Sequence, residues 1–210
     1  MYMPYILPMA LYLVLTGLGS AFDYRGYLLY PVKTVLVLIS LLYFRRRYRE
    51  VELRQGFFTV LMAVATGLVA FVVWVVPEGW YPQMGNSEFN PYVFGAGYLS
   101  AVLILFRLVG AVLVVPVFEE LFWRSFVIRY LIESDFRRVP MGQFTWFSFV
   151  ATSVLFGFEH HRWLVGIATG ILYNGLLYYR KKLFPCIVAH AVTNLALGIY
   201  VLWTEQWTFW

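Results

Sequence analysis

Long apolar runs separated by short polar segments make up most of the chain. Each run is long enough for a helix. In lipid a helix is the default, because it pairs its backbone N–H and C=O groups within its own segment. The pattern therefore predicts an all-α fold, a polytopic transmembrane helix bundle with about seven to eight membrane helices. The eight runs are Met3–Phe22, Tyr27–Phe44, Phe57–Val76, Tyr98–Val115, Val117–Ile132, Phe144–Phe158, Trp163–Tyr179 and Leu183–Trp203.

Composition excludes most soluble classes. Of the 210 residues, 61% are hydrophobic and 13% are charged, and the mean hydropathy is +0.71. Ordinary soluble domains are about 45–50% apolar and about 25% charged. Because about a third of the surface of an unfolded chain of this size stays exposed after folding, such an apolar excess cannot be hidden. A cytosolic globule and a disordered chain are excluded, and the single Cys186 excludes a disulfide scaffold.

Basic residues give the chain a net charge of +5, and they gather in short clusters between the apolar runs. The clusters Arg45–Arg54, Arg137–Arg138 and Arg180–Lys182 are typical of cytoplasmic membrane loops, not of a nucleic-acid surface, so no nucleic-acid partner is expected. They predict a cytoplasmic N-terminus and an outward-facing loop at Pro77–Gly97. The run from Met3 lacks a basic leader and a cleavage site, so it is predicted to be a retained span.

The fourth and fifth runs conflict with this topology. Tyr98–Val115 returns to the inside, yet Val117–Ile132 ends beside Arg137 and Arg138, which are also expected inside. Pro116 separates the two runs, and a proline inside a helix favours a bend. Either one long helix bends at Pro116 and protrudes into the cytoplasm, or the second piece is re-entrant.

Ionisable residues within the apolar runs need an explanation, because a charge at the bilayer centre costs at least about 2.5–3.5 kcal/mol. Lys33 and Arg107 are expected to snorkel or to pair within the bundle. Arg129 is expected at a cytoplasmic helix end, and Asn174 in helix packing. The full set is Lys33, Arg107, Glu119, Glu120, Arg124, Arg129, Glu159, His160, His161, Arg162, Asn174, His190 and Asn194, of which His161 and Arg162 are expected at an interfacial turn.

Three short patterns stand out within this set. Glu120 and Arg124 are four residues apart, with the acid first, which favours an ion pair on one helix face. Glu119 lies about 100° around the helix and stays free to act as a general base. His160 closes the Phe144–Phe158 run. His190 and Asn194 share one face of the last run, and side chains from three runs can meet only inside a bundle.

Several hydrolytic chemistries are absent from the sequence. There is no His-Glu-x-x-His motif and no Gly-x-Ser-x-Gly elbow. The two aspartates, Asp23 and Asp135, fall in loops, so a pair of intramembrane aspartates is excluded. What remains is a glutamate and a histidine to activate water, with a second histidine and an asparagine as oxyanion donors, which is the equipment of a peptide hydrolase.

These patterns resemble, in order, the three signature motifs of the CPBP membrane proteases. This is the CAAX-protease and bacteriocin-processing family, also called the Abi family, which includes the Rce1-like prenyl-protein endopeptidases. The resemblance covers Tyr98–Trp203 within a single integral membrane domain, 1–210, and leaves 1–97 as accessory helices and an outer loop. Ser125 stands where the family commonly has glycine, and Trp123 is bulkier than usual. A weaker resemblance, from length and aromatic content, is to CAAX-protease-related proteins that accompany bacterial exosortases.

The resemblance implies roles for six residues. Glu119 and His160 would activate the hydrolytic water, His190 and Asn194 would stabilise the oxyanion, and Glu120 and Arg124 would support them. No cofactor is expected. If a metal takes part, Glu119, His160 and His190 are the candidate zinc ligands.

The resemblance further implies a membrane-embedded peptide or protein substrate, CAAX-type or otherwise lipid-modified, in contact with the lipid bilayer. The expected location is a prokaryotic plasma membrane, with the N-terminus and the opening of the site both cytoplasmic. Two alternatives stay open. A non-catalytic CPBP-like binding or immunity protein, or an exosortase-associated factor, has no need of the complete motif set. A proton-linked carrier would be expected to show the paired half-helices or repeated halves of many transporters.

Overall fold

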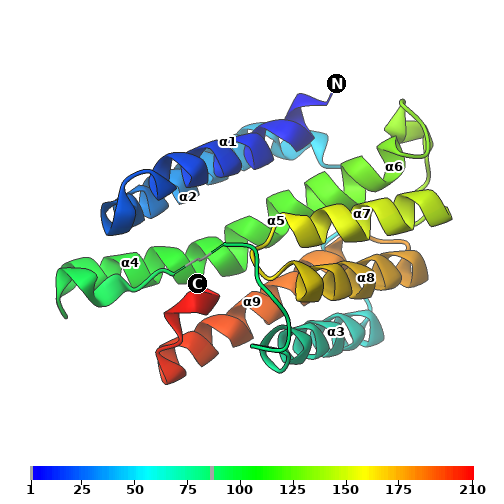
Figure 1. Ribbon diagram of the computed structural model, residues 1–210. Coiled ribbons are helices and arrows are strands. Elements are labelled where there is room, and N and C mark those ends of the chain that lie inside the picture. Colours follow the sequence, from blue (N-terminus) through cyan, green and yellow to red (C-terminus); the bar gives the residue numbers. More distant parts are fainter. Residues whose placement is uncertain (1, 86–87) are drawn as a thin grey trace.

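A computed structural model describes residues 2–85 and 88–210, with the side chain of Tyr24 left out, and that part of the chain contains helices and no β-strand. The predicted all-helical polytopic bundle is confirmed (Figure 1). Its α-helices are α1 (Met3–Ser20), α2 (Leu29–Phe44), α3 (Phe57–Val75), α4 (Tyr98–Val109), α5 (Val115–Glu120), α6 (Ile128–Tyr130), α7 (Trp146–Phe158), α8 (Trp163–Arg180) and α9 (Phe184–Thr204).

The fourth and fifth apolar runs form one continuous helix, Tyr98–Tyr130, so the described chain folds into seven long helices and the re-entrant alternative is wrong. Two π-helical segments, η4 (Gly110–Val114) and η5 (Leu121–Val127), lie between α4, α5 and α6. Pro116 stands in the first turn of α5, directly after η4. The wider π turn accommodates the missing N–H of Pro116 without ending the helix.

The bundle has two parts on either side of this long helix (Figure 1). On one side α1 and α2 form an antiparallel hairpin. On the other side α9 packs against α3 and α8, and α7 packs against α8. Close approach requires a small residue where α3 meets α9, because a Cβ on Gly67 would clash with the carbonyl oxygen of Ala189. The long helix therefore contacts both parts and is the natural place for a shared site.

Five helices in the described residues are long and apolar enough to cross a membrane: α1, the segment Arg25–Arg47 that contains α2, α3, the long helix Tyr98–Tyr130, and α9. The shorter α7 has 13 residues. The turn that joins α7 to α8 consequently lies beside α5, partway along the long helix and not at its end (Figure 1). Polar residues at this turn are thereby brought to the middle of the bundle.

The three basic clusters gather at the end of the bundle where α1 begins. Glu50, from the connection after α2, accepts a hydrogen bond from Tyr5 (2.8 Å) and pairs with Arg129 (3.5 Å) at the far end of the long helix. Glu52 pairs with Lys182 (3.2 Å) after α8. These contacts bring the connection after α2, the end of the long helix and the segment after α8 to one end of the bundle, as the sequence predicts.

Candidate active site

Glu120 is the centre of a buried ionic contact. Its Oε1 accepts hydrogen bonds from Nη1 of Arg124 (3.2 Å) and from Nδ1 of His190 (2.9 Å). Glu120 and Arg124 are 0% and 1% exposed, so the pair is removed from solvent. The ion pair predicted from the spacing is confirmed, and it also orients the imidazole of His190, whose Nε2 turns toward Glu119.

Arg124 is held from a second direction. Its Nε donates to Oδ1 of Asn174 (3.2 Å), and its guanidinium lies 4.1 Å from the ring centroid of Phe156. The amide of Asn174 donates in turn to Thr152 (3.1 Å) and Ser153 (3.0 Å) on α7. Asn174 thus joins the long helix, α7 and α8 by hydrogen bonds, which is the packing role predicted for it.

Glu119 points to a different side of the helix, as its 100° offset predicts. Its carboxylate is buried, at 4% exposure, and its Oε2 lies 4.0 Å from Nε2 of His190. That distance is too long for a hydrogen bond. Oε2 has no hydrogen-bond partner within residues 2–85 and 88–210. Glu120 is held through Oε1 by Arg124 and His190, although its Oε2 also has no hydrogen-bond partner among the described residues. Glu119 differs because no arginine pairs with it and its Oε2 faces His190 at 4.0 Å.

His160 is positioned by the end of α7. Its Nδ1 lies 2.8 Å from the carbonyl oxygen of Phe156, one helical turn earlier, and its ring meets the edge of Trp74 at 5.3 Å. Because a carbonyl oxygen can only accept, Nδ1 carries the proton. Neutral His160 then presents the lone pair of Nε2 for another group.

The four side chains predicted to form the site line one cavity of about 160 Å³. Glu119 comes from α5, His160 from the turn after α7, and His190 and Asn194 from α9. The structure therefore brings together every candidate catalytic residue, with Glu120 and Arg124 directly behind His190.

Asn194 owes its position to the π-helical segment. Val115 donates its N–H to the carbonyl of Gly110, five residues back, so the next bond of that pattern would run from Pro116 to Ala111. Pro116 has no N–H, and Nδ2 of Asn194 donates to the carbonyl oxygen of Ala111 instead (2.7 Å). The side-chain amide of Asn194 thus provides a donor for the carbonyl oxygen of Ala111. The second amide hydrogen of Asn194 stays available.

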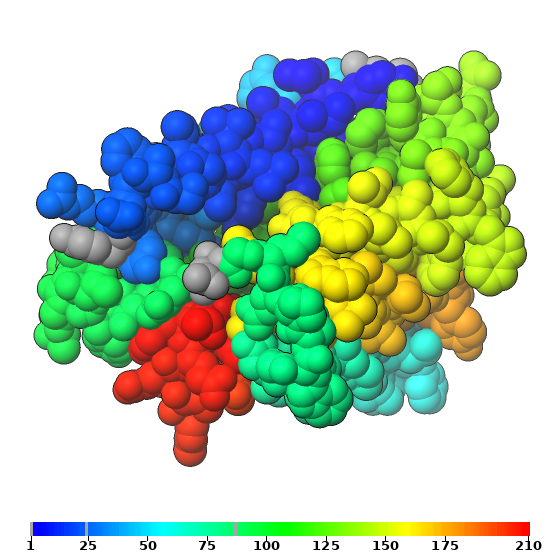
Figure 2. Space-filling view, in the orientation of Figure 1, coloured from blue at the N-terminus to red at the C-terminus, as the bar shows by residue number. Residues whose placement is uncertain are grey.

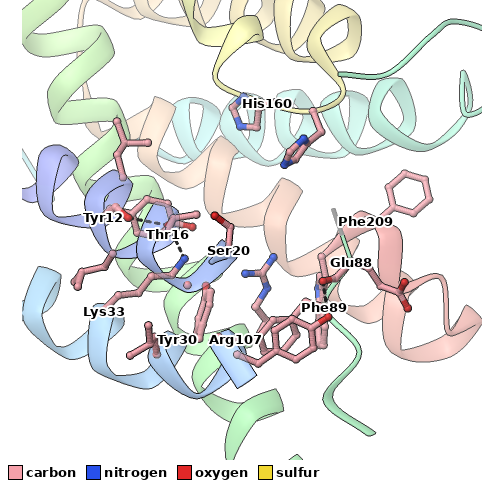
Figure 3. Close-up of a pocket in the computed structure, with 18 of the residues that line it drawn as sticks. Tyr12, Thr16, Ser20, Tyr30, Lys33, Glu88, Phe89, Arg107, His160 and Phe209 are labelled. Carbon is pink, nitrogen blue, oxygen red and sulfur yellow. Dashed lines mark hydrogen bonds between the residues drawn. The ribbon is translucent and has the colours of Figure 1, made fainter. Parts of the chain in front are cut away.

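A larger cavity of about 630 Å³ adjoins this one and shares Glu119 and His160 with it (Figure 3). Its other lining residues include the exposed Ser20, Asp23 and Glu88. They belong to the end of the bundle opposite the start of α1, where residues of the N-terminal hairpin and of the C-terminal segment line the same cavity. Figure 2 shows the hairpin in blue and the C-terminal segment in red. The larger cavity thus reaches the end of the bundle away from the N-terminus, and the cytoplasmic placement of the N-terminus and of the opening stays a prediction. The basic clusters lie at helix ends, but the end at which the cavity opens depends on how the helices pack and on the position of the α7–α8 turn beside α5.

Two polar residues of the α7–α8 turn have roles that the sequence did not reveal. Arg162, expected at an interface, is 5% exposed: it pairs with Glu78 (2.7 Å) and donates to the carbonyl of Thr208 (2.6 Å). Hydrogen bonds from Arg162 hold the pKa of the Glu78 carboxyl below its usual value. Glu159 accepts a hydrogen bond from the indole of Trp123 (2.8 Å) at the cavity wall. Both contacts join segments far apart in sequence, which local spacing cannot show.

The expectations for the other buried cations are met unevenly. Arg129 lies at the helix end as expected, but it is 7% exposed and paired with Glu50. Lys33 and Arg107 form no ion pair with any described acidic residue; within the bundle Lys33 donates to Thr16, and both cations lie over aromatic rings. Lys33 is 6% exposed and does not snorkel to bulk water, and both cations line the larger cavity.

The participation of zinc, with Glu119, His160 and His190 as candidate ligands, stays a prediction. Glu119, His160 and His190 line one cavity, yet no three His, Cys, Asp or Glu side chains in the described residues are grouped as metal ligands. Nδ1 of His190 contacts Glu120 and Nδ1 of His160 contacts the Phe156 carbonyl, so Nε2 of each ring stays free. Histidines that ligate a metal are commonly held in the same way.

Comparison with known families finds a match at residues 100–196 to the Rce1-like family, described as type II CAAX prenyl endopeptidase Rce1-like. The matched range contains all six residues of the three motifs. It confirms the resemblance over this part of the chain, which is an Rce1-like domain of an integral membrane protein. No similar protein was found among curated proteins, and no similar fold among solved structures.

Proposed function

We propose that this chain, whose residues 100–196 form an Rce1-like domain, is an intramembrane endopeptidase that cleaves a membrane-associated peptide with water activated by Glu119 and His160. One observation carries the proposal. The carboxylate of Glu119 is buried without a partner for Oε2 and faces Nε2 of His190 across 4.0 Å, in a cavity shared with His160 and Asn194. A buried ionisable group in a membrane bundle costs free energy, so such a group indicates a functional site.

Glu119 acts as general base in this proposal. Its free oxygen takes one proton from a water molecule while the water oxygen bonds to the carbonyl carbon of the scissile peptide. The Nε2 lone pair of His160 accepts a hydrogen bond from the same water and orients it. When the C–N bond breaks, Glu119 returns the proton to the leaving nitrogen, so the carboxylate is regenerated.

His190 and Asn194 stabilise the negative charge on the former carbonyl oxygen. The Asn194 amide has one hydrogen fixed by Ala111 and one left for the oxyanion. His190 donates from Nδ1 to Glu120, and the oxyanion role requires a proton on Nε2 as well, so that both ring nitrogens donate. Arg124, bound to Glu120, keeps this contact in place. Preorganised donors of this kind each contribute about 10²–10³ in rate.

Access to the site runs through the larger cavity. The larger cavity connects Glu119 and His160 to the end of the bundle opposite the basic clusters. If those clusters are cytoplasmic, as the positive-inside rule predicts, substrate enters from the other side of the membrane. A prokaryotic plasma membrane remains our expectation for the location.

Cleavage of a membrane-anchored peptide library by the purified protein in detergent tests the proposal. We expect Glu119→Gln and His160→Ala to lower the cleavage rate by about 10²–10⁴-fold, the usual contribution of a general base. Glu133→Gln is the matched control, because Glu133 is exposed in the loop between α6 and α7. It should cleave at the wild-type rate.

Two results contradict the proposal. Equal cleavage by wild type and Glu119→Gln would remove the assigned base. Binding of library peptides without cleavage by the wild type would instead support the non-catalytic alternative. Mass spectrometry of the products distinguishes these results, because hydrolysis adds one water across a defined peptide bond.

A further inference from the structure

Two cations reach into the larger cavity from helices α2 and α4. Nζ of Lys33 donates to Oγ1 of Thr16 (2.8 Å) and lies 4.2 Å from the Tyr12 ring. The guanidinium of Arg107 lies 4.6 Å from the Tyr30 ring, and its buried Nε has no hydrogen-bond partner within the described chain. Figure 3 shows the ring of Tyr30 between the two cations, with His160 across the pocket from them.

Lys33, which is buried, and Arg107, which is half-buried, differ from the three buried arginines of the described chain. Arg124, Arg129 and Arg162 each form an ion pair with a glutamate. Neither Lys33 nor Arg107 has an acidic group within 4.0 Å among residues 2–85 and 88–210. The acids that line the same cavity are Asp23, Glu88, Glu119 and Glu159, and none of them pairs with either cation.

The two charges act on each other unfavourably. Arg107 is the charged neighbour that acts electrostatically on Lys33, and like charges at short range repel. Lys33 is also largely removed from water, at 6% exposure, which adds a desolvation cost. A pair of cations in this setting is stabilised when an anion joins them.

We propose that Lys33 and Arg107 form an anion-binding subsite for the substrate, taking a carboxylate or phosphate attached to an apolar chain. The proposal deepens the proposed function and rests on it in one respect: the anion belongs to the molecule that is cleaved. Aromatic rings of Tyr12, Tyr30 and Phe89 surround the two cations and would contact the apolar part.

The position of the subsite relates the anion to the scissile bond. The Tyr12 ring contacts Lys33 and also the ring of Phe118 (4.9 Å), the residue before Glu119. Arg107 precedes Glu119 by 12 residues, about 18 Å along a helix axis. An extended peptide spans at most about 3.3–3.6 Å per residue, so about five extended residues are needed to cover that distance.

The anion has two chemical sources, the C-terminal carboxylate of a peptide and the phosphate of a lipid headgroup. Three probes separate them: an N-dodecanoyl tetrapeptide of apolar residues with a free C-terminus, the same lipopeptide with a C-terminal amide, and lysophosphatidic acid. Their affinities are measured by displacement of a fluorescent analogue of the free-acid lipopeptide from Glu119→Gln protein in nanodiscs of phosphatidylcholine. This background prevents cleavage and leaves the subsite intact.

We expect the free acid to bind about 10- to 100-fold more tightly than the amide, as one charge-assisted contact allows. Lys33→Met and Arg107→Gln should each reduce this preference, and Lys33→Arg should keep it. Lys181→Met is the matched control, since Lys181 lies outside the cavity and should change nothing. Tight binding of lysophosphatidic acid that is lost in Lys33→Met, without an acid preference for the lipopeptide, would assign the subsite to a lipid phosphate and refute its place in binding the cleaved peptide.

Equal affinity for acid and amide, together with lysophosphatidic acid binding that Lys33→Met leaves unchanged, would overturn the subsite. The comparison of acid with amide needs no cavity variant, so it decides the question even if Lys33→Met does not fold. The binding assay is independent of turnover. Cleavage by the wild type without an acid preference would refute the subsite alone, and an acid preference without cleavage would refute the proposed hydrolysis alone.

Discussion

Replacing Arg124 by methionine should destabilise the bundle strongly, because it leaves the Glu120 carboxylate buried without its cation. Methionine keeps much of the side-chain volume and removes the charge. Arg124 contacts Glu120 (3.2 Å), Asn174 (3.2 Å) and the rings of Phe156 (4.1 Å) and Tyr173 (5.3 Å). Only His190 would remain as a partner of Glu120.

The magnitude follows from the burial of the pair. Both side chains are at most 1% exposed, so solvent cannot take over the lost contact. Removing one member of a buried ion pair costs about 3–5 kcal/mol. For a chain of about this size that lowers the unfolding temperature by about 6–20 °C. In Glu120→Gln/Arg124→Met the uncompensated charge is absent, and a neutral side chain can still accept from His190, so the double variant should be more stable than Arg124→Met alone.

Thermal unfolding in one detergent, followed by tryptophan fluorescence, measures all variants. Arg138→Met is the matched control: its pair with Asp135 (2.9 Å) is 75% and 37% exposed, and such pairs contribute about 1 kcal/mol or less. The reasoning is refuted if Arg124→Met unfolds within 2 °C of Arg138→Met, roughly the effect of 1 kcal/mol in a chain of this size. It is also refuted if Glu120→Gln lowers the stability of Arg124→Met further, because the charge would then not be the cause.

Two further predictions concern the outer end of the bundle. In intact cells, a membrane-impermeant maleimide should label Ser20→Cys at the cavity mouth and leave Arg46→Cys unlabelled. Cys186 is buried and should give no background. The reverse pattern would show that the basic clusters lie outside the cell. The depressed pKa of Glu78 means that its contact with Arg162 stabilises the fold above the usual carboxyl pKa near 4.5 and is lost as pH falls through the lower folded value. The unfolding temperature of the wild type should therefore drop more between about pH 5 and pH 3 than that of Glu78→Gln; parallel curves would show that the contact contributes nothing.

Helix content and the Glu120–Arg124 contact were predictable because both depend on short stretches of sequence. Apolar runs must be helical in lipid. A four-residue spacing brings two side chains to one face even where, as here, a π-helical segment begins directly after Glu120. The course of the chain at Pro116 is the exception, because the sequence left a bent long helix and a re-entrant piece as alternatives. The π-helical turn η4 accommodates the missing N–H of Pro116, so the helix continues. The effect of proline on a helix is judged from the proline alone, and that does not predict a change of hydrogen-bond pattern in the preceding segment.

Contacts between distant segments were not predictable from spacing. The bond from His190 to Glu120 joins residues 70 positions apart, and the bond from Asn194 to Ala111 joins residues 83 apart. Each depends on how α9 packs against the long helix. The motifs identify which residues belong to the site, whereas packing decides that His190 is tied to Glu120 and that Glu119 remains free.

The division into accessory helices 1–97 and a core is too simple for the site. Tyr12, Lys33 and Trp74 all belong to the first 97 residues, and each lines a cavity that contains Glu119 and His160. The matched family range, 100–196, contains the residues proposed to activate water and to stabilise the oxyanion, but not these walls. In our proposals, chemistry and substrate selection reside in different parts of the chain. The part that carries no motif holds Lys33, which has no acidic partner among the described residues and which we propose to bind the anion of the substrate.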